Sequence, residues 1–321
     1  MSANYFICLK LGFLALVGTT VTIVMCLIMQ QSPTLVEKMN WIYFYEYEPI
    51  YKTNFTFTQH VKCKDTNPFL VILVSSRPKD TFVRQAIRIT WGSVNMWFGH
   101  HVKTLFLLGQ EPNEDARMET LIEYESKLNG DIIRQDFLDT YHNLTLKTIM
   151  AFQWVSQFCP NAKYIMKADS DVFINTPNLL NFLLTFNSSD SLFTGYPLFD
   201  NYVQRSILHK AYISYLEYPF RIYPHYCSGL GYVLSGKLAL KIYEVMSHVK
   251  PIWIEDAYVG ICLKVLNVAV HAPRNPELFV LYAVEFSLCE YRKACAVHGL
   301  SSNEIIKVWD AIQKNTLGKC S

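Results

Sequence analysis

Apolar and polar positions follow two different periods from residue 68 onward. Residues 69–74 form an unbroken apolar run, which is typical of a strand buried on both faces of a sheet. The segments 102–108, 132–133 and 163–166 predict further strands. Helices are predicted over 82–91, with Asp80 or Thr81 as its cap, over 114–128, and where Leu146, Met150, Trp154 and Phe158 recur at four-residue spacing. Strands that alternate with helices predict an α/β domain with a mostly parallel sheet flanked by helices.

The N-terminal region has a different pattern. Residues 11–29 carry no charge, and at about 1.5 Å per residue they span about 30 Å, the thickness of a bilayer core. A cleaved signal peptide is the alternative, but the run continues into Gln30-Gln31-Ser32-Pro33, which is a poor cleavage site. We therefore predict a cytosolic tail at 1–10, a transmembrane signal anchor at 11–29, a stem at 30–67 and a lumenal domain at 68–321. The stem is rich in aromatic residues, so we expect its second half to pack on the domain.

Charge and composition narrow the function. Lysine and arginine total 29 against 27 acids, and no basic run stands out, which argues against nucleic-acid binding. Asn54, Asn143 and Asn187 are candidate N-glycosylation sites. Seven cysteines follow the anchor, and in an oxidising lumen we expect most to be paired and one to be left over, with the pairing open.

Two acids lie directly after the predicted strand at 163–166. Residues two apart in an extended chain project to the same side, so Asp169 and Asp171 can converge on one divalent cation. Oxygen ligands with a vacant position suit Mg²⁺ or Mn²⁺ that holds a diphosphate. The alternative is a strand-end turn whose acids cap the next helix.

Three further features are candidates for chemistry, and each has a structural alternative. Arg84 and Arg88 lie one helical turn apart and form either a phosphate clamp or a solvated surface pair. The glycines of Tyr226-Cys227-Ser228-Gly229-Leu230-Gly231-Tyr232 indicate either a backbone that approaches a sugar ring or a tight turn.

The third feature is the acidic pair Glu255-Asp256, which lies in an apolar segment. Burial would raise the pKa of such a carboxyl group toward that of a useful base, although acids that begin a helix are the ordinary alternative. His271 and His298 are either metal ligands or structural residues.

Taken in order, these fragments resemble the β-1,3-glycosyltransferase family, which includes β-1,3-galactosyltransferases and β-1,3-N-acetylglucosaminyltransferases. The resemblance covers about 68–312 and rests on these motifs: Arg84-Gln85-Ala86-Ile87-Arg88-Ile89-Thr90-Trp91-Gly92, Phe106-Leu107-Leu108-Gly109, Asp136-Phe137-Leu138-Asp139-Thr140-Tyr141, Asn143-Leu144-Thr145-Leu146-Lys147-Thr148, Asp169-Ser170-Asp171-Val172-Phe173, Tyr226-Cys227-Ser228-Gly229 and Glu255-Asp256-Ala257-Tyr258-Val259-Gly260. The segments 40–51 and 132–136 are similar to members that transfer N-acetylgalactosamine.

The resemblance implies a GT-A fold, a type II Golgi membrane enzyme, a UDP-sugar donor (UDP-GalNAc or UDP-Gal), a galactose-terminated glycolipid acceptor and Mn²⁺ or Mg²⁺. It implies these roles: Asp256 as catalytic base; Asp171, Asp169 and His298 at the metal, with His271 as second choice; Arg84, Arg88, Trp91 and Asp169 at the donor; Tyr226, Gly229 and Glu255 at the acceptor.

The chain departs from the family pattern near both substrates. Ala168 stands where Thr is expected, His225 stands where Pro is expected, and Trp253-Ile254 replaces a Lys-Phe pair. Two alternatives to GalNAc transfer therefore stay open. One is a β-1,3-galactosyltransferase that uses UDP-Gal, and the other is a catalytically inactive lumenal glycan-binding protein or chaperone with the same fold.

Overall fold

The computed structural model describes residues 53–58, 63, 67–113, 116–186, 191–282 and 287–314. The predicted tail, the predicted anchor at 11–29 and Asn187 lie outside the described residues. Within the described ranges, no helix combines the length and apolar character needed to cross a membrane. All elements described below belong to one compact unit, Pro49–Ser247 with Pro251–Ser321.

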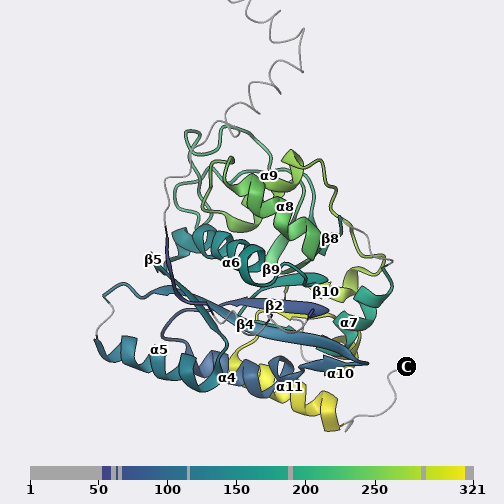
Figure 1. Ribbon diagram of the computed structural model, residues 1–321. Coiled ribbons are helices and arrows are strands. Elements are labelled where there is room, and N and C mark those ends of the chain that lie inside the picture. The colour runs from purple at the N-terminus through teal and green to yellow at the C-terminus, as the bar shows by residue number, and fades with distance from the viewer. Residues whose placement is uncertain are drawn as a thin grey trace, which may run out of the picture. The chain divides into compact units, whose positions relative to one another are not determined.

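A mixed β-sheet is the centre of this unit (Figure 1). In the described part of the chain its strands follow the order β1-β5-β4-β2-β6-β9-β8, and β3 pairs with β4. Their bounds are β1 (Phe55–Phe57), β2 (Leu70–Ser75), β3 (Met96–Trp97), β4 (His100–Gln110), β5 (Ile132–Leu138), β6 (Tyr164–Asp169), β8 (Phe193–Leu198) and β9 (Tyr226–Ser235).

The prediction of a mostly parallel sheet is wrong, because parallel and antiparallel strand pairs are equally frequent along the order given above. The four central strands β5, β4, β2 and β6 are parallel, but β1 is antiparallel to β5, β9 to β6, and β8 to β9. A small second sheet joins β10 (Phe279–Val280), β11 (Ala296–His298) and β7 (Val172–Ile174) in that order. It brings the C-terminal part of the chain against the segment that follows β6.

Helices cover both faces of the main sheet. Figure 1 shows α6, α8 and α9 on one face and α4, α5 and α11 on the other. The helices are α4 (Thr81–Ile89), α5 (Ala116–Asn129), α6 (Leu144–Phe158), α7 (Thr176–Leu184), α8 (Gly236–Met246), α9 (Glu255–Val265), α10 (Leu288–Lys293) and α11 (Ser302–Lys314), with short 3-10 helices at Trp91–Ser93, Tyr141–Asn143 and Pro276–Leu278. The three helices predicted from the pattern are thus confirmed. Asp80 occupies the cap position of α4, but its carboxylate bonds to Arg77 rather than to the helix.

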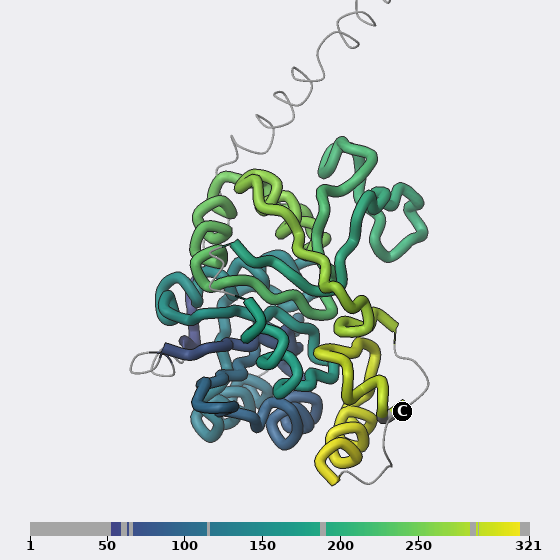
Figure 2. The backbone as a smooth tube through the Cα atoms, turned by 90° about the vertical axis from the view of Figure 1, so that its right-hand side faces the viewer, coloured from purple at the N-terminus to yellow at the C-terminus, as the bar shows by residue number. Residues whose placement is uncertain are grey.

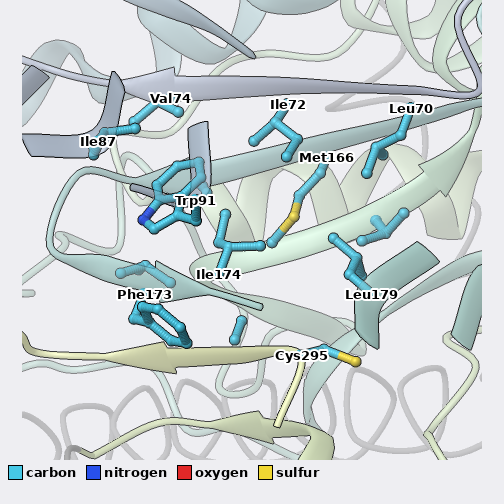
Figure 3. Close-up of a cluster of buried hydrophobic side chains, with 14 of the residues drawn as sticks. Leu70, Ile72, Val74, Ile87, Trp91, Met166, Phe173, Ile174, Leu179 and Cys295 are labelled. Atoms are coloured by element: carbon cyan, nitrogen blue, oxygen red, sulfur yellow. The ribbon is translucent and has the colours of Figure 1, made fainter. Parts of the chain in front are cut away.

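One hydrophobic core lies between the sheet and α4 and α11 and extends over the small sheet, and buried apolar side chains of α6, α8 and α9 cover the opposite face. All six residues of β2 are buried, as the apolar run predicted. Figure 3 shows Trp91 among apolar side chains that include Ile87, Val74 and Ile174. Because this packing fixes β2 and β6 side by side, with Ser75 opposite Asp169, the carboxyl ends of the two strands lie at the same edge of the sheet.

The end of the predicted stem packs on the domain, as expected. β1 extends the sheet beside β5, and the indole N–H of Trp154 donates to the carbonyl oxygen of Thr58. A disulfide joins Cys63 to Cys159 at the end of α6. The folded domain therefore begins upstream of residue 68.

The expectation of one unpaired cysteine is wrong. Cys289 is disulfide-bonded in addition to the first pair, but the described residues contain three buried free thiols, Cys227, Cys262 and Cys295. Each is a small apolar side chain within the packed interior, which requires no partner.

Candidate active site

The turn between β6 and β7 carries the acidic pair. Asp169 is the last residue of β6, whereas Asp171 lies in the turn before β7, so the extended-chain argument does not describe their geometry. The carboxylate of Asp169 accepts from the ammonium group of Lys167 at 2.8 Å. The carboxylate of Asp171 instead lies 3.4 Å from Nε2 of His298. The two acids thus face different partners in this structure.

His298 reaches Asp171 because β11 pairs antiparallel with β7, with His298 opposite Val172. The Nδ1 atom of His298 lies 3.0 Å from the carbonyl oxygen of Leu281. A carbonyl only accepts, so Nδ1 is the donor and Nε2 is the atom presented to Asp171. The bond to Asp171 raises the pKa of His298 despite partial burial. Burial raises the pKa of Asp171, but the bond and charge of His298 outweigh it, and the pKa is lowered.

This pair is the part of the site best suited to a cation. The side chains of His298 and Asp171 are 34% and 54% exposed, so a ligand can reach both. Over the described ranges, however, no three His, Cys, Asp or Glu side chains lie close enough together to hold a metal ion. His271, the second choice, forms an isolated bridge with Thr194 beside β8 and stacks edge-on against Phe186.

Lys167 connects the acidic turn to the second acidic segment. Its side chain is 3% exposed, and its ammonium group donates to Asp169 at 2.8 Å, to Glu255 at 2.5 Å and to the carbonyl of Gly229 at 3.2 Å. Burial alone would lower the pKa of Lys167, but the two carboxylates raise it well above its usual range. Lys167 is therefore a permanent cation beneath the site. Lys167 was not among the predicted site residues, although a lysine at the end of an apolar strand indicates a buried charge that needs partners.

Glu255 is a structural partner of this lysine and not an acceptor contact. It is 6% exposed, and its carboxylate accepts from Lys167, from the hydroxyl of Thr148 at 2.9 Å and from that of Tyr232 at 3.5 Å. Its buried side chain is enclosed by these partners, so the predicted acceptor role of Glu255 is corrected.

The carboxylate of Asp256 is fixed by backbone groups instead of by a lysine. It is the second residue of α9, and its two carboxylate oxygens accept from the backbone N–H groups of Gly229 at 3.0 Å and Ala257 at 2.8 Å. Burial and then the charge of Glu255 raise the pKa of Asp256 to about 7, although Lys167 opposes them. The alternative interpretation was an ordinary acid at the start of a helix. Asp256 does lie in the first turn of α9, and its pKa is also raised. Its carboxyl group has the proton affinity of a general base at neutral pH.

The pH dependence of the reaction should reflect this pKa. A base works only when it is deprotonated, so kcat/KM should rise about tenfold per pH unit below pH 7 and level off above it. Initial rates between pH 5 and 9 with subsaturating substrates measure this. A profile that is flat from pH 5 to 8 would contradict the assignment of Asp256.

Gly229 is required beside these acids for a steric reason. A β-carbon at this position would lie 2.8 Å from Oε1 of Glu255, 3.5 Å from the ammonium nitrogen of Lys167 and 3.6 Å from Oδ2 of Asp256. The predicted place of Gly229 at the site is thus explained by packing.

Gly229→Ala should displace the Glu255 carboxylate and disturb both acids. We expect a loss of about 1–3 kcal/mol in the free energy of unfolding, typical of overpacking, and a lower kcat. Thermal melting and initial rates measure both effects. Gly99→Ala is a control, since a β-carbon there meets no atom within 4 Å, although its positive φ of 78° adds local strain. Wild-type rates and melting for Gly229→Ala would show that the close contact is unimportant.

The predicted donor contacts Arg84, Arg88 and Trp91 are corrected. Arg84 and Trp91 are fully buried. The guanidinium group of Arg84 donates to Glu125 and to carbonyls of the loop after β2, and that of Arg88 binds Asp131 and Glu125. The two arginines join α4 to α5 and to the loop before β5, and Trp91 packs in the core, so a phosphate would have to displace existing partners of both arginines. Our proposal for donor binding therefore rests on Asp169 and the Asp171–His298 pair.

Tyr226 lies at the start of β9 and is also buried, and its hydroxyl accepts from the amide of Asn201.

A more accessible aromatic group lies beside the base. The ring of Trp253 lies 4.6 Å from that of His142 and 5.7 Å from that of Tyr141. Burial raises the pKa of Tyr141, and the charges of Asp256 and Asp169 raise it further, so Tyr141 lies within electrostatic range of both acids.

A second buried ion pair supports the strand ends. The ammonium group of Lys147 donates to both oxygens of Asp139, at 2.7 and 2.8 Å, and to the carbonyl of Ser76 at 2.7 Å. Asp139 also accepts from the backbone N–H of Gly109. Burial lowers the pKa of Lys147. These contacts fix the ends of β2, β4 and β5 around the site.

Comparisons with known proteins identify the class to which this fold and site belong. A family model described as Galactosyltransferase matches residues 83–274. The chain is 58% identical over 285 residues to UDP-GalNAc:beta-1,3-N-acetylgalactosaminyltransferase 1 of Mus musculus and 57% identical to that of Homo sapiens, with 88% of this chain and 86% of each relative covered. It is 39% identical over 279 residues to Beta-1,3-galactosyltransferase 5 of Homo sapiens, covering 86% of this chain and 89% of that relative.

The chain belongs to the galactosyltransferase family and is a glycosyltransferase. The resemblance noted from the sequence motifs is thereby confirmed.

Proposed function

We propose that this protein transfers N-acetylgalactosamine from UDP-GalNAc to the 3-hydroxyl group of a terminal galactose on a glycolipid, with inversion at the anomeric carbon. The relatives with the same UDP-GalNAc name, at 57–58% identity over 88% of the chain, supply the donor and linkage. The observation that carries the mechanism is Asp256, a carboxyl group with a pKa of about 7 fixed by two backbone N–H groups. We further propose that the domain has the GT-A fold and is held in the Golgi membrane by the predicted anchor at 11–29.

In the proposed reaction, Asp256 accepts the proton of the acceptor 3-hydroxyl while the oxygen of that hydroxyl forms a bond to the anomeric carbon of the donor sugar. The bond from that carbon to the UDP oxygen breaks on the opposite face, and UDP leaves with the electron pair. Lys167 neutralises Asp169 and Glu255, so the negative charge beside Asp256 is partly balanced. Held in this way, the base needs no reorganisation at the moment of proton transfer.

The acceptor galactose has a suitable surface beside the base. Tyr141 is 52% exposed and forms, with His142 and Trp253, an aromatic group next to Asp256. Sugar rings stack on aromatic faces through their apolar C–H sides. We assign acceptor binding to this group, with Gly229 kept as the backbone contact to the base.

The Asp171–His298 pair fits a divalent cation in its chemistry. A carboxylate and an imidazole nitrogen with a backbone-bonded Nδ1 are ligands for Mn²⁺, and two protein ligands suffice when a diphosphate and water supply the others. When bound there, such an ion would supply positive charge opposite the leaving diphosphate. Asp169, whose side chain is 36% exposed at the end of β6, is assigned to the sugar-nucleotide donor rather than to the ion.

Removing either member of the pair should therefore weaken metal-dependent UDP binding. For Asp171→Ala and His298→Ala we expect Mn²⁺-dependent affinity for UDP to fall about 10–100-fold, with little change in melting temperature. Calorimetric titration of UDP with and without Mn²⁺ measures this. His271→Ala is the matched control and should bind as wild type. Unchanged Mn²⁺-dependent binding in both pair variants would exclude the pair as ligands.

UDP-Gal is the second candidate donor, because the family model and the human β-1,3-galactosyltransferase 5 relative favour galactose transfer. Incubating the full chain with UDP-GalNAc, UDP-Gal and UDP-GlcNAc, Mn²⁺ and a galactose-terminated trisaccharide separates the two. The proposal expects product only, or mainly, with UDP-GalNAc. Product with UDP-Gal alone supports the galactosyltransferase, and no product with any donor supports the inactive binding protein.

The predicted modification sites differ in their surroundings. Asn54 is exposed, and its amide donates to Asp136. Asn143 is half-buried and donates to the carbonyl of Leu138, while the hydroxyl of Thr145 in the same motif is buried against Ile252. We propose a lumenal glycan at Asn54 in preference to Asn143.

A further inference from the structure

The connection between β8 and β9, residues 199–225, presents large apolar side chains to solvent. Ile207 and Leu208 are 76% and 93% exposed, and Tyr215 and Leu216 are 67% and 87% exposed. They occupy two tight turns, at 206–209 and 214–218, which we call the paired turns. An exposed apolar group of this size is uncommon on a soluble protein and marks an interaction surface.

The paired turns are built on a fixed base. The backbone N–H of Ile213 donates to the carbonyl of Gln204 at 3.1 Å and closes the first turn. The guanidinium group of Arg205 donates to the carbonyls of Ile213, Tyr218 and Phe220 at 2.6–2.8 Å and so ties both turns together. Figure 2 shows the segment as two loops that project from the rest of the domain. The apolar tips are thus held outward by internal bonds.

The charges of the segment favour a lipid headgroup region. It contains two acids, and both have partners within it: Glu217 accepts from the backbone N–H and the hydroxyl of Ser214, and Asp200 lies 3.8 Å from His225. The cation Lys210 is exposed two residues after Leu208, and Arg221 is exposed where its guanidinium group lies over the ring of Tyr202. Long cationic side chains and tyrosines next to inserted apolar residues are typical of proteins that lie on a bilayer surface.

The same segment continues into the active site. Asn201, near its start, bonds to Tyr226 at the beginning of β9, and Gly229 on that strand donates to the base Asp256. The tips therefore belong to the same connection whose other end borders the acceptor site. An acceptor with a sugar head and an apolar tail would fit such a surface.

We propose that the paired turns insert into the surface of the bilayer that holds the acceptor glycolipid, and so place its sugar at Asp256. This inference rests on the proposed function, because it assumes a lipid-linked acceptor. The turns act on presentation of the acceptor and take no part in the chemical step.

The test uses the full chain in phosphatidylcholine proteoliposomes that contain a galactose-terminated glycolipid, with the free trisaccharide as a second acceptor. For the variant Ile207→Ser/Leu208→Ser/Leu216→Ser, we expect kcat/KM for the glycolipid to fall about tenfold, because three side chains lose their apolar contact with lipid. We expect kcat/KM for the trisaccharide to stay within about twofold of wild type. Leu128→Ser is the matched control, since Leu128 is 69% exposed on α5, which covers the sheet face opposite α9 (Figure 1).

Four results would overturn the proposal. Equal losses with both acceptors would make the turns part of the active site, and no loss with either would leave them without this role. An equal loss in Leu128→Ser would show a general surface effect. Loss of self-association in light scattering, with an unchanged ratio of the two kcat/KM values, would assign the turns to a second copy of the chain.

Failure of the proposed function is distinguishable from failure of this inference. If wild type transfers to neither acceptor, quenching of tryptophan fluorescence by brominated lipids still decides whether the turns touch the bilayer. Leu208→Trp should gain a quenched emission that Leu128→Trp lacks. Equal quenching in the two variants would contradict the insertion.

Discussion

Asp256→Asn should lower the transfer rate by about 10²–10⁴-fold, the usual contribution of a positioned general base. The amide cannot accept the proton of the acceptor hydroxyl, whereas the Asp171–His298 pair and Lys167 are left unchanged. Single-turnover assays with UDP-GalNAc and the trisaccharide measure the rate. Calorimetry should show wild-type affinity for UDP in the presence of Mn²⁺.

The fold of this variant needs its own control, because Asp256 accepts two backbone N–H bonds and an asparagine amide retains only one acceptor atom. Asp256→Ala should show the same loss of rate, and thermal melting checks that both variants fold. A rate within a few-fold of wild type in the two folded variants would remove Asp256 from the role of base.

Lys167→Met should destabilise the protein by about 3–5 kcal/mol, because it leaves the buried carboxylate of Glu255 without its cation. Asp169 is 36% exposed and can turn to water, so most of the cost comes from Glu255. Denaturant unfolding measures the change, and the melting temperature should fall on the order of 10 °C.

A double variant separates charge from packing. In Lys167→Met/Glu255→Gln the neutral amide keeps its bonds to Thr148 and Tyr232 without a buried charge, so part of the lost stability should return. Lys127→Met is the control for an exposed ion pair, since its partner Glu123 is 44% exposed, and it should change stability by less than about 1 kcal/mol. A double variant less stable than Lys167→Met would contradict the ionic account.

The sequence predicted the parts of the fold that depend on local pattern. β2 and α6 form where the apolar run and the four-residue spacing placed them, because each buries its own apolar residues. The arrangement of β1, β8 and β9 depends on pairing between distant segments, and no local period encodes strand direction. Half of the neighbouring strand pairs along the order of the described main sheet are for that reason antiparallel, against the expectation.

The candidate site also has some residues that the local sequence pattern indicates and others that depend on pairing between distant segments. Asp256 was a candidate from sequence because a carboxylate in an apolar segment is costly to bury without hydrogen-bond donors. The structure supplies two backbone N–H donors to it. The pairing of Asp171 with His298 matches the resemblance, but it exists only because β11 pairs with β7. Arg84 was misread because its partner Glu125 lies on another helix, 41 positions away, and nothing in the local pattern reveals it.

A ternary complex of Asp256→Asn with UDP, Mn²⁺ and the trisaccharide tests the central claim most directly. The account predicts that the galactose 3-hydroxyl lies within hydrogen-bond reach of the side chain at position 256, about 2.6–3.2 Å, with the diphosphate at Asp171 and His298. If that hydroxyl instead contacts another carboxylate or imidazole, with position 256 out of reach, the assignment of the base is wrong.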